Sequence, residues 1–301
     1  MILVWLGCAS PPVEEDQDRD GIPFPADCDD TDPAASECDA PAFLDLATGG
    51  DGICAIRGTG ELVCWGDPQY GQAPPDPPSG TFRSVAAWYQ SYCGIRDDFS
   101  VACWGDPATP EPDSAFRAGR IDVGYLQVCA LGPGGEPSCW GSCGYGCEPP
   151  APGPFESLDL GSTETCAVAL GGGSVSCWGS SATPLPEGDW RQVGVGLDIT
   201  CGVATDGRLA CVGGSDRVDP SAAPSGEFVA VTAGSEIACA IRADRTATCW
   251  TADNWAGQAD PPPEARFAKV AVGGNFACGL SLEGEIVCWG NNDYGQLDVP
   301  S

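Results

Sequence analysis

The repeat unit of this chain is clearest in Phe267-Ala-Lys-Val-Ala-Val-Gly-Gly-Asn-Phe-Ala-Cys-Gly-Leu280, continued by Gly284-Glu-Ile-Val-Cys-Trp-Gly290. An aromatic residue, an aliphatic residue, a glycine and a cysteine follow one another at fixed intervals. A second cysteine, followed by tryptophan, comes ten residues after the first. The paired cysteines occur seven times from residue 43 onward, with successive first cysteines 35 to 39 residues apart, and the aromatic residue, the glycine and the tryptophan are each present in six of the seven copies. Such self-similarity indicates a repeat architecture.

The cysteine pairs define the seven copies. The spacing within a pair is ten residues in six copies and eleven in one, where Gly171-Gly172-Gly173 adds a residue. The predicted hairpin bridges are Cys54–Cys64, Cys93–Cys103, Cys129–Cys139, Cys166–Cys177, Cys201–Cys211, Cys239–Cys249 and Cys278–Cys288.

Each pair flanks two short β runs joined by a turn, which predicts a hairpin. Cys54 and Ile56 alternate with the residues between them, as Leu62 and Cys64 do, so each run presents one face. With the turn at Gly58 to Gly60, Cys54 lies opposite Cys64, within disulfide range. A bridge closing so short a loop contributes about 2.5–3 kcal/mol on the chain-entropy model.

The aromatic and aliphatic columns upstream predict a further strand, so each unit has three or four short antiparallel strands. A unit this small buries its apolar face only by stacking on its neighbours. An open β-solenoid and a closed propeller both satisfy that requirement. Units near 40 residues in seven copies favour closure. We predict an all-β, seven-bladed β-propeller over 43–301, after an irregular acidic segment.

The cysteine count indicates an oxidising compartment. There are 19 cysteines and no histidine, and the cysteines do not form clustered metal-binding pairs. Cys28–Cys38 and Cys143–Cys147 are the two remaining predicted bridges, which leaves Cys8 unpaired. The apolar residues 1–8 resemble the end of a bacterial lipoprotein signal, with Cys8 as the lipidated residue. Another secretory signal, or no signal, is the alternative. We expect a secreted or cell-surface (outer-membrane) bacterial lipoprotein.

Residues 9–42 form an acidic segment that resembles Asp-rich calcium motifs of extracellular proteins. Alternate carboxylates, a glycine at Gly21 and a backbone carbonyl suit a hard cation that takes six to eight oxygens. A solvated acidic linker is the alternative interpretation. The predicted Ca²⁺ ligands are Asp16, Asp18, Asp20, Ile22, Asp27, Asp29, Asp30 and Asp32.

Charge restricts the classes of partner. The formal net charge is −30, with 43 acidic residues against 13 basic ones. Such a field repels nucleic acid and anionic lipid head groups. We therefore expect no nucleic-acid partner, membrane contact only through a lipid anchor, and a monomer. The charge serves solubility or steers a basic partner.

The columns of the seventh copy resemble the regulator of chromosome condensation repeat family. The residues that carry the resemblance are Phe267–Leu280 and Gly284–Leu297, and the weaker copies extend it over residues 43–300. The resemblance implies a seven-bladed propeller. The short-repeat bacterial members, which include a secreted propeller-type inhibitor of β-lactamases, are the more similar ones. Eukaryotic members act on a small GTPase and bind chromatin, functions that the acidity of this chain does not favour.

An aromatic residue follows the tryptophan at a fixed offset in four copies. One interpretation is packing between blades, and the other is a ring of aromatic side chains that faces a partner. The candidate partner-binding residues are Tyr70, Tyr145, Trp255 and Tyr294.

The sequence favours binding over catalysis. Without histidine the commonest general base is missing, and no nucleophile or phosphate-loop motif occurs. We expect an extracellular module that recognises a protein or glycan through its loops, with inhibition of a hydrolase as one form of that role. The alternative is a propeller enzyme that uses carboxylates on extracellular glycan, which requires a deep central pocket with convergent carboxylates.

Overall fold

The computed structural model describes residues 42–68, 77–106, 112–113, 115–125, 127–141, 149, 153–180, 183–214 and 216–300. The chain divides into two units, Met1–Ala42 and Phe43–Ser301. The second unit is all-β in its described residues, apart from one turn of 3-10 helix, η3 (Pro220–Ala222). No helix within the described ranges has the length and apolar character needed to cross a membrane.

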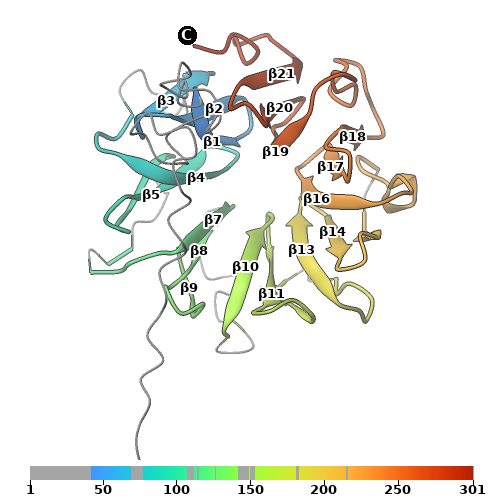
Figure 1. Cartoon of the computed structure of the whole chain (residues 1–301), viewed down its shortest axis with the longest axis horizontal. Helices are drawn as coiled ribbons and strands as arrows, with labels where there is room; N and C mark the ends of the chain where they lie inside the picture. The colour runs from blue at the N-terminus through green and yellow to red at the C-terminus, as the bar shows by residue number, and fades with distance from the viewer. Residues whose placement is uncertain are drawn as a thin grey trace, which may run out of the picture. The chain divides into compact units, whose positions relative to one another are not determined.

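The described residues of the second unit form seven three-stranded antiparallel sheets, each in the order first, middle, outer strand. The seven sheets are arranged in a ring (Figure 1). The first strands are β1 (Phe43–Thr48), β4 (Phe82–Trp88), β7 (Arg120–Gly124), β10 (Phe155–Leu160), β13 (Trp190–Val195), β16 (Phe228–Ala233) and β19 (Phe267–Val272). The middle strands are β2 (Gly52–Arg57), β5 (Ser91–Arg96), β8 (Gln127–Leu131), β11 (Glu164–Ala169), β14 (Ile199–Ala204), β17 (Ala238–Arg242) and β20 (Phe276–Ser281). The outer strands are β3 (Leu62–Gly66), β6 (Val101–Gly105), β9 (Pro137–Gly141), β12 (Val175–Gly179), β15 (Leu209–Gly213), β18 (Ala247–Trp250) and β21 (Ile286–Gly290). The predicted seven-bladed propeller is confirmed, with three strands in each blade. The blades are numbered 1 to 7 in chain order, so that blade 1 holds β1–β3 and blade 7 holds β19–β21.

The hairpin disulfides join the middle and outer strands of every blade. Cys54 lies directly opposite Cys64, as the alternation predicts, and the same pairing recurs in the other six blades. The Cα atoms of each pair are 4.0–4.1 Å apart. All seven predicted hairpin bridges are confirmed.

The hydrophobic core lies between the blades. Each of seven clusters of buried side chains joins two adjacent blades, because a three-stranded sheet cannot cover its own apolar face. One cluster contains Phe43 and Trp65 of blade 1 together with Phe276 and Leu280 of blade 7. The first and last blades therefore pack like any other neighbouring pair, and the ring is closed.

A repeated backbone hydrogen bond also joins neighbouring blades. The N–H of the residue in the aromatic column donates to the carbonyl of a residue in the preceding blade's hairpin turn, at 2.8–3.0 Å. All seven accepting residues have positive φ, which turns their carbonyls toward the neighbour. The bond from Phe43 N–H to the Gly284 carbonyl closes the ring. The seven donor–acceptor pairs are Phe43–Gly284, Phe82–Gly60, Ala118–Phe99, Phe155–Gly135, Trp190–Gly173, Phe228–Gly207 and Phe267–Arg245.

The glycine column five residues before the first cysteine marks a close approach between blades. A Cβ atom on Gly161 would overlap the carbonyl oxygen of Gly196, and one on Gly196 would overlap that of Gly234. Glycine is therefore required here by contact with the next blade rather than by its own backbone angles.

The blade topology gives the ring two faces. The upper face consists of the turns between first and middle strands and the segments that directly follow the outer strands. Backbone bonds such as Asp67 N–H to the Asp51 carbonyl, 2.9 Å, hold these two parts together. The lower face consists of the turns between middle and outer strands.

Candidate functional site

Large exposed apolar side chains divide between the faces by type. Among the described residues, those of the upper face are all aromatic: Tyr89, Tyr125, Trp255 and Tyr294, with exposed fractions of 47–62%. Phe99, Leu170 and Leu282 lie in lower-face turns, and Leu44 is the second residue of β1. The guanidinium of Arg83 covers the ring of Phe99 at 4.3 Å. Exposed aromatic side chains are typical centres of recognition surfaces, so the upper face is the candidate site.

Buried glutamines hold the two loops that carry Trp255 and Tyr294. Gln258 and Gln296 are 1% and 0% exposed. The carbonyl of Gln258 accepts a 2.9 Å bond from Trp289 Nε1, and that of Gln296 accepts one of the same length from Trp65 Nε1. The glutamines, not the aromatic side chains, make the contacts between blades. Trp255 and Tyr294 are themselves 62% and 50% exposed, which favours the partner-facing interpretation, and their role in binding stays a prediction.

The two loops are near copies with one difference in register. Tyr294 N–H donates to Gln296 Oε1 at 2.9 Å, and Ala256 N–H makes the equivalent bond to Gln258 at 3.1 Å. Ala256 therefore takes the place of Tyr294, and the sequence alignment that gave this place to Trp255 is wrong. One extra residue after Trp250 causes the shift, and it leaves Trp255 in the place of Asp293.

Internal bonds fix both loops. Asn254 Nδ2 donates to Asp260 at 3.0 Å, and Asn254 Oδ1 accepts from Ala259 N–H at 2.8 Å. In the other loop, Leu297 N–H donates to Asn292 Oδ1 at 2.8 Å. Loops held in this way lose little conformational entropy when their aromatic side chains bind a partner.

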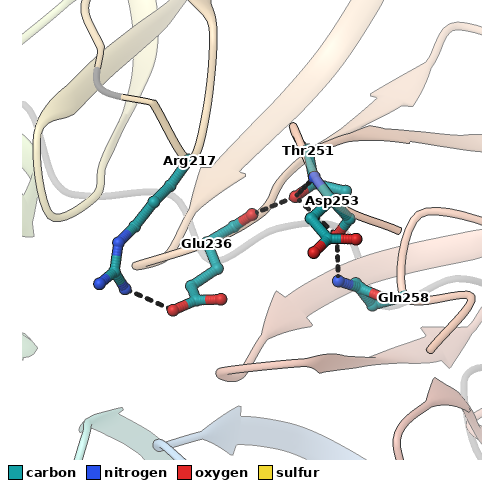
Figure 2. Close-up of polar contacts among 5 residues, drawn as sticks. All are labelled: Arg217, Glu236, Thr251, Asp253 and Gln258. Atoms are coloured by element: carbon teal, nitrogen blue, oxygen red, sulfur yellow. Dashed lines mark hydrogen bonds and ion pairs between the residues drawn. The ribbon is translucent and has the colours of Figure 1, made fainter. Parts of the chain in front are cut away.

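A polar chain links the Trp255 loop to the other upper-face segments of blades 5 and 6. Figure 2 shows Arg217 paired with the Glu236 carboxylate, and Thr251 Oγ1 donating to the Glu236 carbonyl at 2.6 Å. Gln258 Nε2 in turn donates to the Asp253 carbonyl at 2.6 Å. The upper rims of blades 5 and 6 are therefore joined, and the bond from Trp289 Nε1 to the Gln258 carbonyl connects them to β21 of blade 7.

A central cavity of about 1010 Å³ is surrounded by the first strands of the blades. Glycine, alanine and serine form much of its wall, whereas Asp122 and Asp159 line it from blades 3 and 4. Each carboxylate accepts a 2.6 Å bond from a backbone N–H of the next blade, Asp122 from Leu160 and Asp159 from Val195. Gln192 makes a similar link to both backbone groups of Val231.

Lys269 and Asp45 complete these links where blade 7 meets blade 1. Lys269 Nζ lies 2.6 Å from Asp45 Oδ1, and Asp45 Oδ2 accepts from Val85 N–H at 3.0 Å. Sequence reasoning missed this set. One sequence pattern could have revealed it. Polar side chains, among them the single lysine of the chain, stand at inward positions of first strands that are otherwise apolar.

Burial raises the pKa values of both cavity carboxylates. Burial raises the pKa of Asp122 to about 7, against the smaller lowering effects of its backbone bonds and of Lys269. The pKa of Asp159 is raised by burial first and then by the charge of Asp122. The pair therefore favours uptake of a proton.

We expect the propeller to become more stable as the pH falls from about 7 toward about 4. In this window the folded state keeps a proton on Asp122 that the unfolded chain releases, so acid favours the folded form. The variant Asp122→Asn should lose a pH-dependent contribution on the order of 2 kcal/mol. Denaturant unfolding of both proteins across this range measures it. Parallel stability profiles would contradict the assignment.

Among the described residues, one grouping of metal-ligating side chains occurs: Glu164 with Cys166 and Cys177. Both sulfurs belong to a disulfide, so no thiolate is available there. Several predicted sites lie outside the described residues. These are Cys8, the Ca²⁺ ligands Asp16 to Asp32, the bridges Cys28–Cys38 and Cys143–Cys147, and the aromatic residues Tyr70 and Tyr145.

Comparisons with known proteins agree with the geometry. The sequence-family model of the regulator of chromosome condensation (RCC1) repeat matches residues 43–72 and 267–296, in the first and last blades. No curated protein matches the chain in sequence.

Three solved structures illustrate the fold. The CRINKLY WD40 ectodomain of the Arabidopsis thaliana receptor kinase ACR4 has a TM-score of 0.68 at 23% identity, covering 85% of this chain and 98% of that one. The ectodomain of the Physcomitrella patens receptor kinase CR4 gives 0.69 at 21%, covering 82% and 72%. Prp20p of Saccharomyces cerevisiae gives 0.63 at 14%, covering 84% and 83%. The chain thus carries RCC1 repeats in its first and last blades and shares its propeller fold with these proteins.

Proposed function

We propose that this chain is an extracellular protein-recognition module that binds its partner through the upper face of the propeller. The observation that carries the proposal is the exposure of Trp255 and Tyr294, at 62% and 50%, on loops whose backbones are fixed by buried glutamines. Rigid aromatic anchors of this kind supply most of the binding energy in many interfaces.

Two further observations support the extracellular role and the binding of a protein. Seven disulfides, one in each blade, are typical of oxidising compartments. Two of the propellers with the same fold are receptor-kinase ectodomains, and the Prp20p structure is described together with its binding to Gsp1p and histones. On the precedent of Prp20p, we propose recognition of a protein partner for this chain too.

The finer parts of the proposal concern how the module is presented. Lipidation at Cys8 would tether it to a bacterial cell surface, and a Ca²⁺-stiffened segment up to residue 42 would hold the propeller away from that surface. Inhibition is one consequence of binding, reached when the aromatic loops cover the active site of the partner. Mass spectrometry of the mature protein is the direct assay for the lipid.

Replacing both loop aromatics, as Trp255→Ala with Tyr294→Ala, should weaken partner binding at least tenfold. Each loss of a central aromatic anchor costs about 2 kcal/mol in typical interfaces. The oxidised protein is used to capture partners from the extracellular fraction of the source organism, and Kd is then measured with the purified partner.

The matched control is Leu170→Ala with Leu282→Ala, which removes exposed apolar side chains from the lower face. Its affinity should equal that of the wild type. Binding that survives in the aromatic variant, or falls equally in the control, contradicts the use of the upper face.

A carboxylate-based enzyme acting on extracellular glycan is the second candidate. It is favoured by the central cavity and by Asp122 and Asp159, which line it. It ranks second because one oxygen of each carboxylate already accepts a backbone bond from the next blade. If the wild type releases sugars from a glycan panel and Asp122→Asn does not, the second candidate replaces the first.

A further inference from the structure

The two exposed aromatic side chains stand among exposed carboxylates. On the upper rim of blades 5–7 the aspartates Asp198, Asp216, Asp253, Asp260, Asp293 and Asp298 are all exposed. The contacts described above make this rim continuous. Leu197 N–H donates to the Gly234 carbonyl at 3.2 Å, Ala252 N–H donates to the Arg217 carbonyl at 2.8 Å, and Trp289 binds Gln258.

Positive charge is nearly absent from the same surface. Among the described residues of this rim, Arg217 is the single basic side chain, and its guanidinium is paired with Glu236. The other basic side chains of blades 5–7 lie elsewhere: Arg208 and Arg245 in lower-face turns, Arg242 at the end of β17, Arg191 and Lys269 on first strands, and Arg266 just before β19. The rim therefore combines unneutralised carboxylates with aromatic faces.

Arginine is the side chain that both features recognise. Its planar guanidinium forms two parallel bonds with a carboxylate and also stacks on an aromatic face. A neutral partner would compensate the desolvation of these carboxylates only through hydrogen bonds, without opposite charge, and an acidic partner or a nucleic acid would be repelled.

We propose that the upper rim of blades 5–7 binds an arginine-rich segment of a partner protein, with Trp255 and Tyr294 stacking on guanidinium groups between the aspartates. The proposal rests on the function proposed above and names the chemistry of the partner.

The test uses the oxidised full chain and a synthetic peptide of alternating arginine and serine as the probe. The variant Asp198→Asn, Asp216→Asn, Asp253→Asn removes three charges from the rim at carboxylates that hold no loop in place. The matched control, Asp97→Asn, Glu227→Gln, Glu283→Gln, removes three charges from the lower side of the ring, outside the rim. Both variants have the same net charge, so a difference between them isolates the position of the charges.

The rim variant should bind the peptide about tenfold more weakly than the wild type, and the control should match the wild type. Trp255→Ala should also weaken binding, and a glutamate–serine peptide should not bind. Circular dichroism and the mass of the fully bridged protein confirm that each variant is folded. Equal losses in both charge variants, or no binding of the arginine peptide, overturn the proposal.

Failure of this inference is distinct from failure of the proposed function. If partner capture depends on Trp255 and Tyr294 but the arginine peptide does not bind the rim, the function stands and the partner chemistry is wrong. If capture ignores the two aromatic residues, the recognition surface itself is wrong.

Discussion

Reduction of all seven hairpin disulfides is expected to unfold the propeller. Each bridge closes a loop of ten or eleven residues and contributes about 2.5–3 kcal/mol by restricting the unfolded chain. Seven such contributions exceed the net stability of about 5–15 kcal/mol that is typical of a folded domain. The measurement is near-ultraviolet circular dichroism of protein that has been reduced in denaturant, alkylated and returned to buffer.

A variant that lacks one bridge measures how much a single disulfide contributes to the free energy of unfolding. Replacing Cys54 and Cys64 together by serine removes one staple from blade 1 and leaves six in place. This protein should fold and should lose about 2.5–3 kcal/mol in its free energy of unfolding. A cooperative, unchanged unfolding transition in the fully alkylated protein would show that the blades hold together without their bridges.

Gly49→Ala is expected to destabilise the propeller by about 3 kcal/mol, whereas Gly50→Ala should be nearly neutral. A Cβ atom on Gly49 would overlap the Tyr89 carbonyl oxygen and lie 2.5 Å from the Tyr92 hydroxyl oxygen. Tyr92 is fully buried and cannot move aside, so the join between blades 1 and 2 must open. On Gly50 the nearest atom would be 3.6 Å away, an ordinary contact.

Thermal unfolding measures the difference between these neighbouring substitutions. For a unit of this size, the loss in Gly49→Ala corresponds to a fall in Tm on the order of 5–10 °C. Equal Tm values for the two variants would show that the close approach of the blades does not constrain this column.

The fold was predictable because the repeated side chains determine structure within their own blade. The Cys54–Cys64 spacing determines a hairpin register with no reference to the rest of the chain. The glycine column could be recognised as a pattern, but its cause could not, because the clash involves the carbonyl of another blade. Sequence alone therefore identified the blades and left their joins unexplained.

The candidate site was predictable only in part, for the same reason. Trp255 and Tyr294 were identified by counting from the tryptophan, and their exposure favours the partner-facing interpretation over packing between blades. Counting failed at Trp255, because one additional residue after Trp250 shifts the loop and only the bonds to Gln258 reveal it. Asp122 and Asp159 carry no local motif. Their proximity arises from the ring, which brings separate first strands to one cavity.

The contacts that close the ring join segments that the ribosome synthesises far apart in time. Trp65 and Gln296, which are hydrogen-bonded across the last join, are 231 residues apart in the chain. At roughly 5–20 residues per second, a ribosome needs on the order of ten to fifty seconds to deliver the second after the first. Until blade 7 follows, one apolar side of blade 1 has no neighbour to cover it. Each crosslink joins cysteines ten or eleven positions apart within one hairpin, so in an oxidising compartment it can form before the ring closes and stabilise a blade that still lacks a neighbour.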